Sequence, residues 1–379
     1  MGRKIMPRND SSGETTNVRL SFVNTDAKLR EAAEAVAARR SRDGIDQLVG
    51  GLECCIINTE PDRQNAALGE LTARTGYSLQ DAFATLDRRW AVLSFPGSAD
   101  LVVTSRLSGP NPFACPPDYP VCVVRPDARL ETFVYRCHDL RTYVEVQKAR
   151  GVEFLTPDPV ELEEGLFIQT TPSTYTRNST GFVEWTGGRR HYRTTGAMAW
   201  DPAVQADGIT ACRQHVKHLD HAATRVQAEH RDPAILEFMS LTGYSFDFAV
   251  YVDELNSITN VARHPEDPFA LVFTSGVSPF VSPDESGPTE RFVYRYGPRT
   301  HHLAFHTENI DTVYQAMVEA GVEFLVDLVG GEDQGLKQTF TGGSPSTLLV
   351  NEYIYRYGDF DGFFTRHNVA VLTEATGRQ

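Results

Sequence analysis

Three residues of types that bind metal ions lie in the last third of the chain, each in a short strand-like segment. His221 lies in LDHAATRV, His302 in HHLAFHTENI and Glu352 in TLLVNEYIYRYG. Two imidazoles and one carboxylate suit Fe(II), because this set binds one side of the metal and leaves positions open for oxygen and a substrate. The residue types therefore predict an oxygenase-type iron site with His221, His302 and Glu352 as its catalytic metal ligands.

The strand around Glu352 needs a cation. Alternate side chains of a strand point to one face, which groups Glu352 with Leu348, Val350 and Ile354. A carboxylate among aliphatic side chains costs several kcal/mol unless a cation meets it. A metal ion could fill that role and so could the nearby Arg356, and this strand alone favours neither.

The composition indicates a globular protein with two domains. The chain has 379 residues, 41% of them hydrophobic, which is enough to fill two cores. Its net charge of -14 argues against nucleic acid as a partner. The sequence shows neither an apolar run of membrane-spanning length nor the apolar segment of a secretory signal, so we expect no membrane association and a cytoplasmic location.

The cysteines give no sign of a metal site or a disulfide framework. No CxxC pair occurs, and the spacing is irregular, so we expect buried or incidental thiols in a reducing compartment. The six residues are Cys54, Cys55, Cys115, Cys122, Cys137 and Cys212.

An internal duplication organises the chain. The segment at 66–86 resembles that at 234–255, and 131–155 resembles 300–325. Each copy reads as a strand, a helix and three strands, followed by the same order again. We therefore predict an α+β fold of two tandem domains, in which paired βαβββ units form a half-open barrel.

The boundaries follow from this duplication. Residues 1–44 form an N-terminal extension with an amphipathic helix, and 45–190 form an N-terminal structural domain without the metal ligands. The segment TGGRRHYRTTGAMAWDPAVQADG at 186–208 is rich in Gly, Arg and Thr and shows no clear periodicity. It predicts a linker at 191–212 that leads to the C-terminal catalytic domain at 213–379.

The second copy allows a more detailed prediction. Its helices are expected at 233–242 and 309–320, and residues 275–289 are expected to form a loop. The predicted strands are 219–226, 246–253, 258–263, 269–274, 300–307, 322–326, 336–341 and 347–356.

Aligning the two copies predicts that only the second binds metal, because the first lacks both histidines. The alignment places Cys54 opposite His221, Thr132 opposite His302, and Glu184 opposite Glu352.

The second half resembles the 4-hydroxyphenylpyruvate dioxygenase and 4-hydroxymandelate synthase family of the vicinal oxygen chelate superfamily. The similar motifs are Asp220-His221, HLAF at 302–305, GVEFL at 321–325, the run at 336–356 and FFTRHNVAVLTEA at 363–375. Fold-level similarity extends over about residues 45 to 379.

The resemblance implies an activity and roles for the matching residues. It implies an Fe(II)-dependent dioxygenase that oxidatively decarboxylates an aryl 2-oxo acid, with molecular oxygen, and hydroxylates the same molecule. It also implies a homodimer or homotetramer. His221, His302 and Glu352 match the family's iron ligands. The implied substrate-binding residues are Gln338, Phe340, Phe364, Asn368, Val369 and, about where a pocket Asn is expected, Ser275.

Departures from the family leave the substrate open. Val369 follows Asn368 where the ring-hydroxylating dioxygenases usually have Phe, which favours benzylic hydroxylation, of mandelate type, over ring hydroxylation, of homogentisate type. The residue that contacts the ring hydroxyl is undecided, because Ser257 and Asn260 in the long hairpin are both candidates.

Two other functions remain open: an extradiol-type ring-cleaving dioxygenase with the same ligands, and a non-catalytic protein that binds a small molecule in the same fold. His301 must face away from His302 and is not expected to bind the metal. His306 lies on the same strand face as His302. A structural role is favoured for it over a hydrogen bond to a metal ligand.

Overall fold

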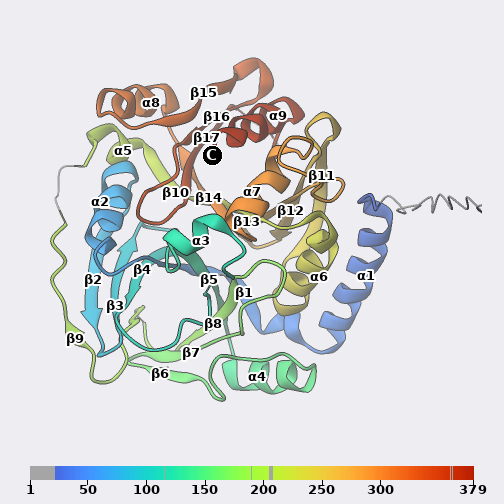
Figure 1. The fold of residues 1–379 in the computed structure, drawn as a ribbon. Coiled ribbons are helices and arrows are strands. Elements are labelled where there is room, and N and C mark those ends of the chain that lie inside the picture. The colour runs from blue at the N-terminus through green and yellow to red at the C-terminus, as the bar shows by residue number, and fades with distance from the viewer. Residues whose placement is uncertain (1–21, 115, 189, 205–207, 359, 361) are drawn as a thin grey trace, which may run out of the picture.

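Two curved sheets, one in each half of the chain, form the framework of the protein (Figure 1). The computed structural model describes residues 22–379 apart from 115, 189, 205–207, 359 and 361. The beginning of the predicted extension therefore lies outside the described residues, as does Cys115. Cys54, Cys55, Cys137 and Cys212 are buried free thiols, as predicted.

The first sheet has the strand order β6-β7-β8-β5-β1-β4-β3-β2-β9 and forms the N-terminal half-barrel. Its helices are α2 (Gln64–Arg74), α3 (Pro120–Val124) and α4 (Leu140–Ala149), with a 3-10 turn at Ile45–Gln47. Its strands are β1 (Val49–Asn58), β2 (Ser78–Ala84), β3 (Arg88–Ser94), β4 (Asp100–Arg106), β5 (Arg129–Cys137), β6 (Val160–Leu162), β7 (Gly165–Gln169), β8 (Ser179–Trp185) and β9 (Met198–Ala199).

The second sheet has the order β11-β12-β13-β10-β14-β17-β16-β15 and forms the C-terminal half-barrel. Its helices are α5 (Thr210–His215), α6 (Arg231–Leu241), α7 (Pro288–Tyr296), α8 (Ile310–Glu319) and α9 (Arg366–Ala375). Its strands are β10 (Val216–Arg225), β11 (Ser245–Val252), β12 (Ser257–His264), β13 (Asp267–Ser275), β14 (Arg299–Thr307), β15 (Phe324–Gly331), β16 (Leu336–Thr341) and β17 (Val350–Arg356).

The two sheets repeat the same pairing. An antiparallel pair lies at the centre of each, β1 with β5 and β10 with β14. Each central strand also pairs in parallel with the last strand of its own βαβββ unit, as in β10 with β13 and β14 with β17. The predicted duplication and half-barrel architecture are thus present in the structure.

Strand alternation separates the core from the interior of the C-terminal half-barrel. Leu303, Phe305 and Tyr353 belong to a core cluster shared with the first half, and each is almost fully buried. Their strand neighbours His302 and Glu352 instead line a cavity inside the sheet. The apolar residues that hold the two halves together therefore also fix which side chains face inward.

Two predicted segments differ from the structure. Residues 275–289 were expected to be a loop, but α7 begins at Pro288, which suits the first turn of a helix because its fixed φ is helical. The strand expected from 347 begins only at Val350, because Leu348 has a left-handed backbone with φ of 61°.

The N-terminal helix α1 (Asp26–Arg42) packs on the second half of the chain, against α6 and β11. Its Asp26 accepts hydrogen bonds from Arg231 Nη2 at 2.5 Å and from the Tyr251 hydroxyl at 2.6 Å. Arg40 donates to backbone carbonyls of the second half, including Thr242 O at 3.0 Å. The helix therefore joins the C-terminal half-barrel rather than the domain that follows it in sequence.

The C-terminal helix α9 closes the C-terminal half-barrel. It packs against the edge strands β11 and β15 and against β16, so it spans the open side of the sheet (Figure 1). Thr365 caps it by accepting a hydrogen bond from Asn368 N.

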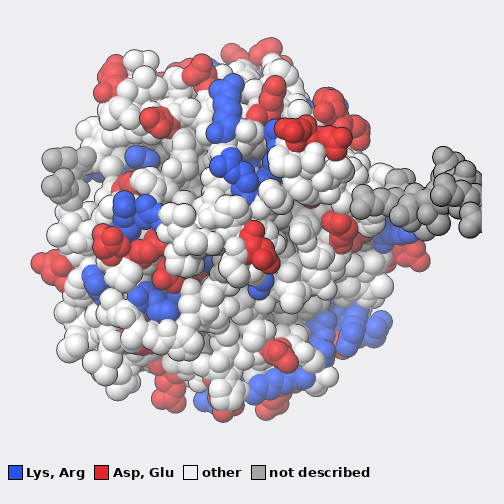
Figure 2. Space-filling model, viewed as in Figure 1, with Lys and Arg blue, Asp and Glu red and all other residues white. Residues whose placement is uncertain are grey.

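Among the described residues, no helix has the length and apolar character needed to cross a membrane. On the face shown in Figure 2, acidic and basic side chains are interspersed.

Candidate metal centre

The ligand atoms of His221, His302 and Glu352 all lie within 4.8 Å of one another, and all three residues are buried. Nε2 of His221 and Nε2 of His302 are each 3.1 Å from Oε2 of Glu352. Strand pairing causes this convergence, because His302 lies opposite Ala223 on β10 and Glu352 lies opposite Ala304 on β14. The structure therefore brings together the three side chains predicted as metal ligands.

His221 is held from behind by a carboxylate. Its Nδ1 lies 2.7 Å from Asp220 Oδ1, and Arg356 binds both Asp220 oxygens at 2.5 and 3.0 Å. Because Nδ1 carries the proton in this bond, Nε2 is turned toward the site. The alternative in which Arg356 neutralises Glu352 is wrong, since Arg356 pairs with Asp220.

His302 is held by a chain of polar side chains that sequence reasoning missed. Its Nδ1 lies 2.8 Å from Nδ1 of His301, and Nε2 of His301 lies 2.8 Å from Oε1 of Gln379. His301 thus fixes the ring of His302, although strand alternation had predicted that the two side chains face apart. His306 instead stacks on His218, with the ring centroids 5.0 Å apart, which agrees with the structural role favoured for it.

Glu352 is oriented by two predicted substrate-binding residues. Gln338 Nε2 donates to Glu352 Oε1 at 2.5 Å, and Asn368 Nδ2 donates to Gln338 Oε1 at 3.0 Å. These bonds fix one carboxylate oxygen and leave Oε2 directed at the two imidazoles. Gln338 and Asn368 therefore position the carboxylate, and Asn368 is not among the residues that line the cavity.

The electrostatics of the site favour a bound cation. Burial opposes protonation of His221, but the charges of Glu352 and Asp220 outweigh it and raise the pKa of His221 to about 9. Burial and the neighbouring histidines His301 and His221 hold the pKa of His302 well below its usual range. A metal ion at Glu352 would replace the proton on His221, and His302 is already neutral, as a ligand must be. The residues present therefore fit a divalent cation such as Fe(II).

The cavity beside the three ligands has a volume of about 40 Å³, which is room for about three water molecules. Among the predicted substrate-binding residues, Gln338, Phe340, Phe364 and Val369 line it. The ring centroid of Phe364 lies 5.2 Å from that of His221, and the ring centroid of Phe340 lies 4.8 Å from that of His302.

Other predicted contacts point elsewhere. Ser275 lies outside the cavity lining, and its hydroxyl donates to Gly276 O at 3.1 Å. Ser257 bonds Thr289, and Asn260 accepts from Arg231 Nε at 2.9 Å, so neither faces the cavity. Thr259, which lies between them, does line it.

Sequence reasoning also missed a polar end of the cavity, lined by Arg225, Thr259, Thr274 and Thr289. Arg225 is four residues after His221 on β10, and Thr289 belongs to α7. The helical signal of α7, a proline at its start and a glycine after its end, was available in the sequence.

The expected counterpart of Glu352 in the first half is wrong. Val134 on β5 pairs with Gly181 on β8, as Ala304 pairs with Glu352, so the strand register places Gly181 opposite Glu352. Glu184 lies three residues further on and accepts a hydrogen bond from Leu140 N. Cys54 and Thr132 do occupy the positions of the two histidines.

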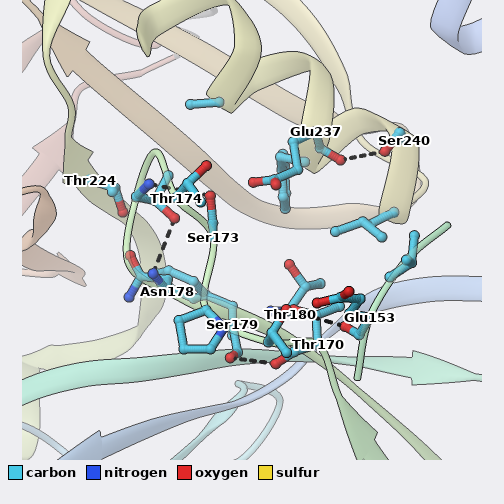
Figure 3. A pocket seen from close by; sticks show the side chains of 18 of the residues that line it. Glu153, Thr170, Ser173, Thr174, Asn178, Ser179, Thr180, Thr224, Glu237 and Ser240 are labelled. Carbon is cyan, nitrogen blue, oxygen red and sulfur yellow. Dashed lines mark hydrogen bonds between the residues drawn. The ribbon is translucent and has the colours of Figure 1, made fainter. Parts of the chain in front are cut away.

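A separate cavity of about 310 Å³ lies between the halves and is lined largely by hydroxyl groups (Figure 3). Thr224, which alternates with Ala223 on β10, faces this cavity and not the metal ligands. The polar groups that line this cavity largely form hydrogen bonds within the protein. Ser179 Oγ donates to Thr170 O and Ser240 Oγ donates to Glu237 O, both at 2.7 Å. The metal-ligand cluster therefore lies elsewhere.

Comparison with known proteins identifies the fold. No protein-family model and no curated protein matches the sequence. A mutant of 4-hydroxymandelate synthase from Streptomyces coelicolor has a similar structure, with a TM-score of 0.65 and 19% identity over 87% of this chain and 99% of that one. A fusion of a xylose isomerase-like TIM barrel and 4-hydroxyphenylpyruvate dioxygenase has a TM-score of 0.58 and 15% identity, over 92% of this chain and 57% of that chain. The predicted fold of two tandem vicinal-oxygen-chelate domains is confirmed.

Proposed function

We propose that this chain is a non-haem Fe(II)-dependent dioxygenase that oxidatively decarboxylates an aryl 2-oxo acid and hydroxylates the same molecule. It would then belong with the 4-hydroxyphenylpyruvate dioxygenases and 4-hydroxymandelate synthases that its sequence motifs resemble. In the reaction, one oxygen atom of O2 enters the carboxylate formed as CO2 leaves, and the other forms the new hydroxyl.

One observation carries the proposal. His221, His302 and Glu352 converge within 4.8 Å, and His302 and Glu352 line a cavity that also has aromatic walls. Two imidazoles and one carboxylate are the ligand set of non-haem Fe(II) oxygenases. Fe(II) bound there would supply open positions at which a 2-oxo acid and oxygen can meet.

The protein's own residues would orient the ligands and exclude water. Gln338 and Asp220 restrain Glu352 and His221, so the ligand geometry is set before substrate arrives. The rings of Phe340 and Phe364 border the two imidazoles and offer apolar surface to an aryl group. The cavity of about 40 Å³ is too small for an aryl 2-oxo acid, so α9 or the segment before it must move to admit substrate.

Benzylic hydroxylation is the favoured outcome. Val369 on α9 lines the cavity. Its aliphatic side chain offers the substrate no aromatic ring at a position where the ring-hydroxylating dioxygenases usually have Phe. A ring that is free to turn can present its benzylic carbon to the metal. The resulting product would be of the 4-hydroxymandelate type.

The test loads the protein with Fe(II) without oxygen, adds 4-hydroxyphenylpyruvate or phenylpyruvate, and then admits oxygen. We expect equal oxygen uptake and CO2 release, with a mandelate-type product identified by mass spectrometry. A homogentisate-type product would refute benzylic hydroxylation and keep the reaction class. Oxygen uptake with catechols but not with 2-oxo acids would refute the class.

A matched pair of variants tests the metal site itself. His221→Ala should abolish turnover, and His306→Ala, which removes a histidine on β14 away from the ligands, should not. Equal Fe(II) content in His221→Ala and wild type would instead favour a non-catalytic protein.

A further inference from the structure

The cavity beside the metal ligands contains a buried cation that lacks an anionic partner. Arg225 is 4% exposed and lines this cavity, and its Nη1 has no hydrogen-bond partner among the described residues. Phe292 covers one face of the guanidinium, with the ring centroid 4.5 Å from Cζ. The edge of the guanidinium is thus available for a ligand in the cavity.

A second arginine adds to this positive charge. Arg299 on β14 lies opposite Arg225 in the strand register and is also buried, and its Nε lacks a partner among the described residues. Within the described part of the chain, neither arginine has a carboxylate oxygen within 4.0 Å. The carboxylate of Glu60 supplies a counter-charge to Arg299, whereas no carboxylate does so for Arg225 among the described residues. A buried cation without a counter-charge is costly, so the surroundings of Arg225 favour an anion.

Hydroxyl groups surround the same end of the cavity. Thr259, Thr274 and Thr289 line it together with Arg225, and Thr274 Oγ1 is buried without a partner in the described structure. Burial lowers the pKa of Arg225 only to about 9, so the guanidinium stays charged at neutral pH. An anionic group here would accept hydrogen bonds from both Arg225 and Thr274.

The position of Arg225 separates this end from the metal ligands. Four residues of strand place its Cα about 13 Å beyond that of His221, and it lies two residues beyond Ala223, which is opposite His302. The cavity therefore has a metal-ligand end, with His302 and Glu352, apolar walls with Phe340 and Phe364, and a cationic end.

Resting on the function proposed above, we propose that Arg225 binds a second anionic group of the substrate, at the end remote from the 2-oxo acid. The substrate class is then a 2-oxo acid with a carboxylate or similar anion on its far side. Charge balance supports this class. A divalent cation, Glu352 and Arg225 together carry a net charge of about +2, because Asp220 and Arg356 neutralise each other and Glu60 offsets Arg299. A dianionic substrate would neutralise the site, whereas a phenol would leave Arg225 uncompensated.

The experiment compares substrates that differ only in the second anion. Fe(II)-loaded protein is titrated without oxygen with 2-oxoadipate against 2-oxohexanoate, and with 4-carboxyphenylpyruvate against phenylpyruvate. Dissociation constants come from calorimetry and from the visible absorption of 2-oxo acids chelated to Fe(II). We expect the dianionic member of at least one pair to bind about 10- to 100-fold more tightly, since a hydrogen bond to a charged group has that effect.

Variants assign the preference to its residue. Arg225→Met should bring the ratio within each pair close to one and leave the binding of the monoanionic acids within about threefold. Arg225→Lys should keep part of the preference, and Thr274→Val should reduce it. Circular dichroism and Fe(II) content show whether each variant is folded.

The outcomes separate the two proposals. If wild type binds both members of each pair equally, the second-anion assignment is wrong and the oxygenase proposal stands. If Arg225→Met weakens all four acids equally, Arg225 contacts the shared 2-oxo acid group, which also refutes the assignment. If no 2-oxo acid gives the chelate absorption, the oxygenase proposal itself fails. The wild-type comparison decides the question even if Arg225→Met does not fold.

Discussion

The N-terminal and C-terminal half-barrels have the same strand order around their central strands but differ at the positions that face inward. Cys54, Thr132 and Gly181 occupy the places that His221, His302 and Glu352 occupy in the second half. The strand register also places Phe167 where Gln338 orients the carboxylate. Identical backbone pairing thus supports a metal-ligand set in one half and none in the other.

The residues behind the inward-facing positions differ less between the two halves than the inward-facing residues do. Each half has an acid immediately before its first inward position, Glu53 in one and Asp220 in the other. Glu53 accepts from Trp185 Nε1 at 2.9 Å, and Asp220 pairs with Arg356, which occupies the equivalent place on its own last strand. In the first half this acid has no imidazole to orient. An acid behind the strand therefore does not by itself indicate a metal site.

The interiors also differ in volume. The N-terminal half-barrel has a cavity of about 680 Å³, lined by apolar and aromatic residues and by polar ones that include Asp87, Arg88 and Arg106, against about 40 Å³ beside the predicted metal ligands. Linker residues Tyr192 and Thr194 line the larger cavity, whereas α9 closes the smaller one. A cavity with room for only about three water molecules limits solvent at a reactive centre, and it must widen to admit substrate.

The largest expected contrast is in metal binding. His221→Ala should weaken Fe(II) binding by more than about 100-fold, because it removes one of three ligands, whereas replacing an outer residue typically costs 10- to 100-fold. Cys54→Ala makes the equivalent change in the first half and should leave Fe(II) binding unchanged. Anaerobic Fe(II) titration measures both. Loss of iron from Cys54→Ala would contradict the division of roles between the halves.

Two buried carboxyl groups provide a contrast in stability. Burial raises the pKa of Glu290 from 4.5 to about 7 despite the hydrogen bond from Gly276 N. Between these pH values the folded protein holds a proton that the unfolded chain has lost, so stability falls as pH rises toward 7 and is constant above it. Relative to Glu290→Gln, wild type should lose roughly 2 to 3 kcal/mol of unfolding free energy between about pH 5 and pH 8.

Glu53 is the matched carboxyl group in the first half. Burial raises its pKa too, but Arg190 Nε lies 2.7 Å from Oε1 and opposes the shift. Glu53→Gln should therefore change the pH dependence of stability in the same direction as Glu290→Gln but by less, because Arg190, which also pairs with Asp100 Oδ2 at 3.4 Å, stabilises the ionised carboxylate of Glu53. Urea denaturation at both pH values measures the two variants. A Glu290→Gln profile parallel to wild type would show that Glu290 titrates normally.

The convergence of His221, His302 and Glu352 could be predicted from the sequence because each lies on a regular strand, where alternation fixes the face. The counterpart of Glu352 in the first half could not be predicted from the sequence. Comparison of residue types suggested Glu184, and only the hydrogen-bonded strand register identifies Gly181. Arg225 was equally hidden. An arginine at a strand end is usually solvated, and the lack of an anionic partner is a property of the folded chain. The contact of His301 with His302 could not be predicted, because it depends on the side-chain rotation of two neighbouring residues.

The last expected contrast concerns the position that has no carboxylate in the first half. A Cβ at Gly181 would lie 2.9 Å from Thr132 Cγ2 and 3.0 Å from Val134 Cγ2, so Gly181→Ala should cost about 1 to 3 kcal/mol of unfolding free energy. Gly69→Ala in α2 meets nothing within 4 Å and should stabilise the protein by about 1 kcal/mol. Adding Thr132→Ser removes the closest methyl group and should restore part of the loss in urea denaturation. If Gly181→Ala were neutral, packing would not be what keeps a larger side chain out of this position, and the absence of a third ligand from the first half-barrel would need another cause.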